Sequence, residues 1–169
     1  MWDQAQNCAI AQYVPLFTGS SWSPDAYASR SGATGGAIYE WGCFDDGFSM
    51  ALAKQTIEEA KATRKYWYGD IYPLMPITVA LDQMMAWQLH RADLNEGIIL
   101  AFRREQCPSL AIAPKLRGLD PKKTYRLDFI DDARKKTTRM ISGKELLNTG
   151  LELRLPKAGS SLLVMYRPT

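Results

Sequence analysis

The sequence predicts an α+β protein, in which a mostly helical first part, residues 1–70, precedes an antiparallel β-sandwich, residues 71–169. Two observations predict this fold class. Up to about residue 70 the apolar residues recur mainly at helical spacing, whereas most later segments alternate apolar and polar side chains with a period of two. Pro73 and Pro76 lie where the pattern changes, and proline interrupts helices.

The helical part begins with a short helix over residues 3–13, which has no Gly or Pro before Pro15. A second short helix follows, with Ser23 as the N-cap, Pro24 at the first helical position and Gly32 as the stop. Residues 37–41 are apolar and partly β-branched or aromatic, which predicts one buried strand. The order helix, strand, helix is typical of one βα unit of a larger barrel or doubly wound sheet, and one unit cannot close a sheet.

A long helix is predicted from Asp45 to about Tyr66, with Asp45 or Asp46 as its cap. Its apolar stripe consists of Met50, Ala53, Ile57 and Ala60. The capping position favours a structural role for both aspartates over a general acid and base pair.

Seven strands are predicted in the second part, at 84–90, 98–104, 109–116, 124–130, 138–142, 151–156 and 162–167. Turn residues such as Asp120-Pro121 separate them, and residues 143–148 suit one helical turn. Seven short strands with clear alternation are typical of an antiparallel sandwich.

Composition excludes several classes of function. Apolar residues make up 46% and charged residues 23%, which is ordinary for a folded globular protein. The net charge is +3, and the densest basic cluster, Arg134 to Lys136, follows Asp131 and Asp132, which argues against a nucleic-acid surface. The N-terminus has no basic segment and no apolar run reaches the roughly 20 residues of a membrane span, so we expect no membrane partner and slightly favour the cytoplasm.

Metal and cofactor sites are also not expected. The three cysteines are far apart and have neither a C-x-x-C spacing nor a nearby histidine. His90 is the only histidine, and we expect it in a surface or strand-end polar contact, not in a catalytic triad.

Several phrases resemble the C-terminal stretch of family 36 glycoside hydrolases, the α-galactosidase family. YWYGDIYPL at 66–74 is similar to the segment that leads out of that family's catalytic barrel, and MMAWQLHRADLNEGIILAFRR at 84–104 to the strand pair that follows. LRGLDPKKTYRL, ISGKELLNTGLEL and LLVMYR continue the resemblance. It extends back to residues 3–17 and 24–32, so it spans nearly the whole chain.

The resemblance implies that residues 1–70 are the tail of a (β/α)8 barrel and residues 71–169 an accessory sandwich. Family members are retaining enzymes that use two aspartates, a nucleophile and an acid/base. Neither motif has a counterpart here, so no catalytic residue is assigned, and Asp3 corresponds to a helix beyond the acid/base. Whether the chain is an enzyme stays open, and we expect it to be inactive alone.

Substrate contacts, where present, would come from the barrel-like part. Trp2, Trp22 and Trp41 carry aromatic faces that suit sugar rings, although packing in the protein is the commoner use of tryptophan. Trp41 ends a predicted barrel strand, where active-site residues of such barrels lie. Gln4 and Arg30 are weaker candidates for edge contacts.

Three functions therefore compete. The chain is a C-terminal part of an α-galactosidase-like enzyme, a stand-alone carbohydrate-binding or interaction module, or one chain of a split enzyme. Galactosides or other sugars are the expected ligands. Strands and helices without the rest of a barrel expose apolar area, so we expect a homo-oligomer, most simply a dimer, or association with the missing barrel portion.

Overall fold

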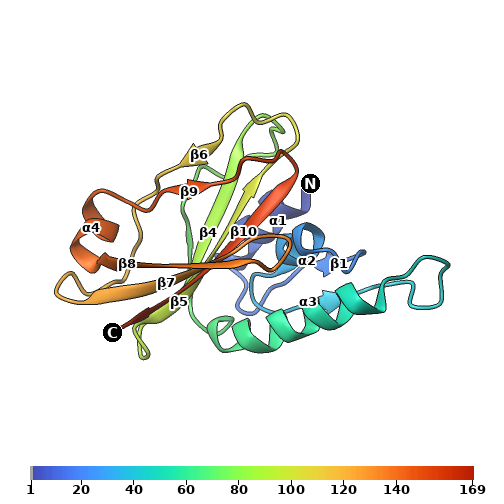
Figure 1. Cartoon of the computed structure of the whole chain (residues 1–169), viewed down its shortest axis with the longest axis horizontal. Coiled ribbons are helices and arrows are strands. Elements are labelled where there is room, and N and C mark those ends of the chain that lie inside the picture. The colour runs from blue at the N-terminus through green and yellow to red at the C-terminus, as the bar shows by residue number, and fades with distance from the viewer. Residues whose placement is uncertain (1) are drawn as a thin grey trace.

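The computed structural model describes residues 2–169 (Figure 1). The first part contains α1 (Trp2–Ala11), β1 (Ser20–Ser21), α2 (Ala26–Gly32), β2 (Ile38–Tyr39), α3 (Met50–Thr63) and the 3-10 turn η1 (Arg64–Tyr66). β3 (Asp70–Pro73) starts where the sequence suggests a domain boundary, and that boundary stays a prediction.

The two N-caps differ from those predicted. Asp25 caps α2, because its Oδ1 accepts a hydrogen bond from the backbone N–H of Ala28 at 2.8 Å. Ser49 caps α3 by accepting from the N–H of Leu52 at 3.3 Å, so α3 begins at Met50 and neither Asp45 nor Asp46 caps it. The glycine at position 47, with a φ of +85°, separates the aspartates from the helix.

One six-stranded antiparallel sheet forms the centre of the molecule, in the order β3-β4-β5-β10-β7-β8. Its other strands are β4 (Met84–Arg91), β5 (Glu96–Arg103), β7 (Thr124–Ile130), β8 (Lys136–Ser142) and β10 (Ser160–Pro168). These five strands confirm those predicted, within two residues at either end.

The sheet is covered on both faces. On one face, Ile99, Leu127 and Val164 pack against Leu146 of α4 (Gly143–Asn148) and Leu153 of β9 (Leu153–Arg154). On the other face, the core includes Cys8 of α1, Tyr66 of η1 and, from the sheet, Trp87, Phe102 and Leu163. Because both faces are covered, β4 and β5 are buried almost continuously and do not alternate.

The second layer of the sandwich is small. It consists of β6 (Ala111–Ile112) paired antiparallel with β9, together with α4 and extended loops. Both strands are two residues long, much shorter than the predicted 109–116 and 151–156. α4 confirms the helical turn predicted at 143–148.

The first part contains a small parallel sheet of β1 and β2, with α2 between them in the chain. The prediction of a single buried strand at 37–41 was wrong in two respects. β2 has a partner strand, β1, and Ile38 is 46% exposed.

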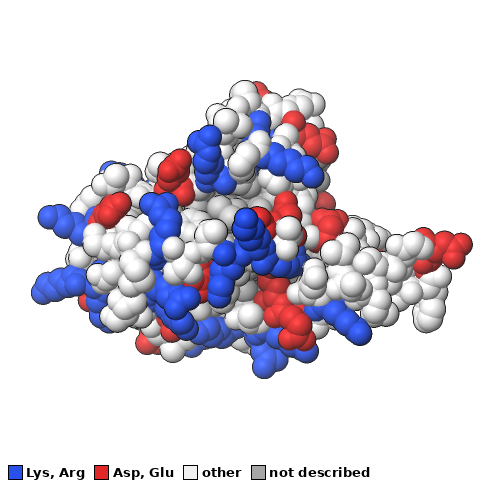
Figure 2. Space-filling model, viewed as in Figure 1, with Lys and Arg blue, Asp and Glu red and all other residues white. Residues whose placement is uncertain are grey.

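α3 turns its predicted apolar stripe partly outward. Met50 and Ile57 are 55% and 38% exposed, whereas Ala53, Thr56 and Thr63 are buried. α3 and the loop between β2 and α3 protrude from the molecule at the right of Figure 1. Figure 2 shows that this protrusion is mostly uncharged, with acidic side chains at its tip.

Candidate functional site

The carboxyl ends of β1 and β2 form the candidate site, which we call the carboxyl edge. The strands are parallel, with Ser20 opposite Ile38 and Ser21 opposite Tyr39. The residues that follow them, Trp22 and the segment 40–49, therefore leave the small sheet at the same end. In barrels and other parallel sheets, this is the end where ligands bind.

Aromatic side chains line the part of the edge that follows β2. The ring of Trp41 stacks on Tyr39, with centroids 4.3 Å apart and an interplanar angle of 24°, and Phe48 lies 6.2 Å from Trp41. The indole N–H of Trp41 donates a long hydrogen bond to Ser21 Oγ at 3.5 Å. Trp41 is thus held by both strands, and one face of its ring is occupied by Tyr39.

A hollow of about 170 Å³ lies beside β1 at the same edge. Trp22 lies on its rim with 72% of its surface exposed, and four serines and Asp3 supply polar groups. The hydroxyl oxygen of Tyr27 is buried there, and burial raises the pKa of this hydroxyl. The lining residues are Asp3, Ser20, Ser21, Trp22, Ser23, Tyr27, Ala28 and Ser31.

Gln4 lies near this hollow but faces inward. Its Nε2 donates to Ser31 Oγ at 2.9 Å, and its Oε1 accepts from Arg104 Nε at 3.1 Å, with the whole side chain buried. Arg104 also donates from Nη1 to the carbonyls of Thr78 and Ala80 at 2.7 and 2.6 Å. Gln4 therefore links α1 to α2 and to the residue that follows β5.

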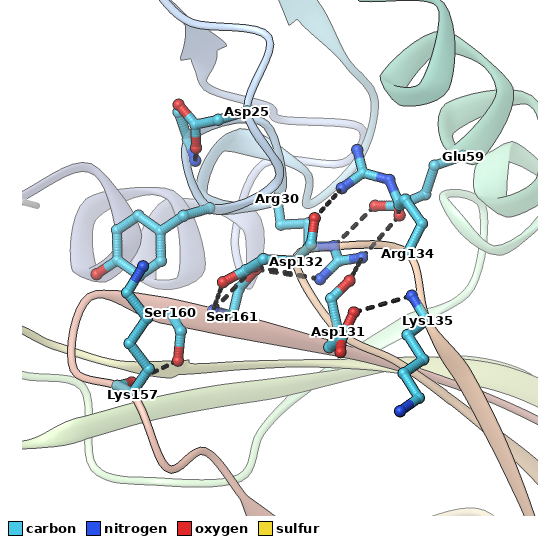
Figure 3. A network of polar contacts seen from close by, with 12 residues as sticks. Asp25, Arg30, Glu59, Asp131, Asp132, Arg134, Lys135, Lys157, Ser160 and Ser161 are labelled. Carbon is cyan, nitrogen blue, oxygen red and sulfur yellow. Dashed lines mark hydrogen bonds and ion pairs between the residues drawn. The ribbon is translucent and has the colours of Figure 1, made fainter. Parts of the chain in front are cut away.

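Arg30 is the centre of a second polar network, which joins α2, α3 and the central sheet (Figure 3). Its guanidinium is 2% exposed and forms two hydrogen bonds with the carboxylate of Glu59, at 2.8 and 2.7 Å. Nη1 donates to Ser161 Oγ at 3.1 Å and lies 3.6 Å from Asp132 Oδ1. Nη2 also donates to the carbonyl of Asp131 at 3.2 Å, which engages all sides of the guanidinium.

The turn between β7 and β8 completes this network. Asp132 accepts hydrogen bonds from both the N–H and the hydroxyl of Ser161 on β10. Nε of Arg134 lies 3.1 Å from Oε2 of Glu59, and Nη2 of Arg134 donates a hydrogen bond to Thr56 Oγ1 at 2.8 Å. Burial lowers the pKa of Arg134, and the neighbouring Glu59 counters that effect.

The four sequence-predicted contact residues thus divide into two groups. Trp22 and Trp41 lie together at the carboxyl edge, whereas Gln4 and Arg30 are buried in polar networks that hold the first part against the sheet. Their roles toward a ligand stay predictions, and the side chain of Trp2 lies outside the described residues.

Sequence reasoning missed Glu59, Asp132 and Ser161 as partners of Arg30. One signal was available, since Thr56, Glu59 and Thr63 recur at helical spacing beside Ala53 and Ala60 and so mark an inward polar stripe. The contacts to Asp132 and Ser161 join residues about a hundred positions apart, and no local pattern encodes them.

Within residues 2–169 no group of three or more His, Cys, Asp or Glu side chains could hold a metal ion. No helix in that range has both the length and the apolar character that a bilayer crossing requires.

Comparison with known proteins finds a family model that matches part of the chain. The glycosyl hydrolase family 36 C-terminal domain matches residues 84–165, from the start of β4 to near the end of β10. This part of the chain is a C-terminal domain like that of family 36. The domain thus comprises five strands of the central sheet and the small second layer, in agreement with the resemblance seen in the sequence.

Solved structures show the same fold over more of the chain. An α-galactosidase variant from Geobacillus stearothermophilus, in complex with raffinose, has a TM-score of 0.63 and 19% identity, covering 84% of this chain and 19% of that one. The α-galactosidase of Lactobacillus brevis has a TM-score of 0.57 and 17% sequence identity, and the match covers 79% of this chain and 18% of that enzyme. The galactosidase domain of an α-galactosidase–sucrose kinase has a TM-score of 0.58 and 16% sequence identity. The match covers 85% of this chain and 19% of that one.

The chain spans about a fifth of the length of these enzymes. At these identities the likeness establishes the fold and not the activity. A search of curated proteins found no significant match.

Proposed function

We propose that this chain is the C-terminal part of an α-galactosidase-like glycoside hydrolase. Residues 1–70 would be the tail of its catalytic barrel, and residues 71–169 an accessory sandwich that packs on the barrel. The observation that carries the proposal is the parallel pair β1–β2 with α2 between the strands and α3 after them, joined to a C-terminal domain like that of family 36.

The unpaired surfaces of the first part support a barrel origin. A two-stranded parallel sheet leaves backbone N–H and C=O groups without partners at both edges, and parallel sheets are ordinarily covered on both faces. Ile38, Phe44, Met50, Leu52 and Ile57 are all exposed along β2, the protruding loop and α3. The rest of a barrel would pair these edges and cover these side chains.

The same proposal makes the chain inactive alone. A retaining glycosidase needs two carboxylates about 5–5.5 Å apart across the scissile bond. Asp45 and Asp46 lie in the protruding loop and are exposed, away from Asp3 and the hollow beside β1. The polar networks of Gln4 and Arg30 then serve to fix the barrel tail on the sandwich.

A second role, sugar binding without catalysis, draws support from the carboxyl edge. Trp22 offers an exposed aromatic face beside a hollow of about 170 Å³ that contains serine hydroxyls. Apolar ring faces and hydroxyl-rich edges are the two features that a sugar presents. In a complete enzyme, Trp22 and Trp41 would then contact substrate.

Two measurements on the purified chain test both roles. We expect no hydrolysis of an aryl α-galactoside, and turnover would contradict the proposed inactivity. Calorimetric titration with galactose and melibiose tests sugar binding, and Trp22→Ala should abolish any heat that is seen. Tyr68→Ala is the matched control, because Tyr68 is also 72% exposed but lies outside the hollow.

A further inference from the structure

A separate hollow of about 160 Å³ lies between η1 and the central sheet, away from the carboxyl edge. Both walls contribute side chains: Lys65 and Tyr66 from η1, and Arg126, Asp128, Met165 and Arg167 from β7 and β10.

Two arginines lie next to each other in the sheet wall of this hollow. The register of β7 and β10 places Arg167 directly opposite Arg126. Residues directly opposite in an antiparallel pair have Cβ atoms about 4.5–5.5 Å apart, and like charges in that position destabilise the pairing. An anion between the two guanidiniums would remove this cost.

The charges around the hollow do not balance. Arg126 Nε donates to Asp128 Oδ1 at 3.1 Å, and Lys65 pairs with Glu96. A hydrogen bond from Thr138 and the adjacent Arg126 hold the pKa of Asp128 below its usual range, so Asp128 stays charged. The side chain of Arg167 has no hydrogen bond or ion pair with any residue in the described range 2–169.

We propose that this hollow binds a small molecule through a single carboxylate, which Arg167 and Arg126 hold together. Lys136 lies 3.9 Å from Asp128 as well, so the cations around the hollow outnumber its two carboxylates and favour an anion. A phosphate ion would leave the apolar wall of the hollow uncovered. Guanidiniums match a carboxylate geometrically through paired N–H donors. Met165 and Ala62 supply an apolar wall for the remainder of the ligand, which suits an acidic sugar.

Calorimetric titration of the 169-residue chain with D-galacturonate, acetate, galactose and inorganic phosphate tests the proposal. We expect galacturonate to bind, with affinity that falls as salt is added. Acetate should bind more weakly, because it lacks the ring that the apolar wall contacts. Galactose should give no heat at this site, and phosphate should bind more weakly than galacturonate.

Arg167→Gln should weaken galacturonate binding about tenfold, the value of one charge-assisted hydrogen bond. Its fold is not at risk, because Arg167 is exposed and its side chain makes no polar contact with the described residues, so its melting temperature should be unchanged or higher. Arg154→Gln, an exposed arginine of the small second layer, is the control that should change nothing. Absent binding, binding that survives Arg167→Gln, or tighter binding of phosphate would each overturn the proposal.

Discussion

Arg30 and Glu59 form a two-bond ion pair between α2 and α3, with N···O distances of 2.8 and 2.7 Å. Arg30 is 2% and Glu59 is 14% exposed, so water screens the pair little. The same guanidinium reaches Ser161 of β10, which makes the pair part of the contact between the first part and the sheet.

Glu59→Gln should lower the free energy of unfolding by about 2–4 kcal/mol, because it leaves the buried guanidinium of Arg30 with only the more distant carboxylate of Asp132, 3.6 Å away. Urea unfolding measures the change. Glu58→Gln is the control: Glu58 also pairs with a cation, Lys61 at 2.7 Å, but is 69% exposed. Its loss should cost no more than about 0.5 kcal/mol. Equal effects of the two substitutions would contradict the assigned importance of the Arg30 network.

Stability should fall as the pH falls through the ordinary titration range of histidine. His90 is 1% exposed, its Nδ1 lies 2.9 Å from Tyr166 Oη, and burial lowers its pKa from the ordinary 6.5. Gln88 Nε2 donates to Tyr166 Oη at 2.7 Å, so His90 belongs to a buried polar cluster with these two side chains. The unfolded chain therefore takes up a proton at higher pH than the folded chain does.

The stabilisation from a neutral His90 is complete above its ordinary pKa of 6.5 and is lost as the pH decreases below that value. Urea unfolding between about pH 5.5 and 7.5 should show a loss of at most about 1.4 kcal/mol per pH unit. The His90→Gln variant should show a flatter profile, and an unchanged slope would show that another group is responsible.

Gly118→Ala should destabilise the protein by about 2–3 kcal/mol, which combines backbone strain and a steric clash. Gly118 has a φ of +75°, and a Cβ built there would lie 2.6 Å from His90 Cδ2. Gly47 separates the two effects, because it has a φ of +85° but nothing within 4 Å of its Cβ position. Gly47→Ala should lower the free energy of unfolding by about 1–2 kcal/mol, as measured by thermal or urea unfolding. A larger loss at Gly47 than at Gly118 would be inconsistent with a clash at Gly118.

The purified chain should self-associate through the exposed side of α3 and the protruding loop. Phe44 is fully exposed, and Met50 follows it at the start of α3 with 55% exposure. Met50→Ser should shift the light-scattering mass toward the monomer. Met140→Ser is the matched control, because Met140 is 54% exposed but lies on β8 of the sandwich. A wild-type chain that stays monomeric at high concentration would contradict the prediction.

The sequence predicted the long strands well and the first part less well, for physical reasons. Tyr125, Leu127 and Phe129 alternate with Arg126 and Asp128 because one face of β7 lies in the core and the other is half exposed, and such a pattern is local. β6 and β9 were predicted too long, because loops with apolar residues such as Leu116 and Leu155 contribute to the core without ladder pairing.

The differences between prediction and structure concern residues whose partners are distant in the sequence. His90 makes a polar contact near the end of β4, one of the two positions expected, but it is buried and not at the surface, because Tyr166 contacts its ring from 76 residues away. Met50 and Ile57 were expected inside and are exposed, because the inward positions of α3 serve the polar contacts of Arg30. The position of Trp22 and Trp41 at the same edge required the parallel pairing of β1 with β2, which nothing in the local sequence specified.

The position of β10 in the sheet sets an order on folding during synthesis. β10 is formed by residues 160–168 and lies between β5 and β7. Until the ribosome has released these residues, β3-β4-β5 and β7-β8 are two separate ribbons with open edges, and Arg30 has no Ser161 to bind. Docking of α2 and closure of the sandwich thus depend on one late strand, and the nascent chain must stay free of aggregation until that strand emerges.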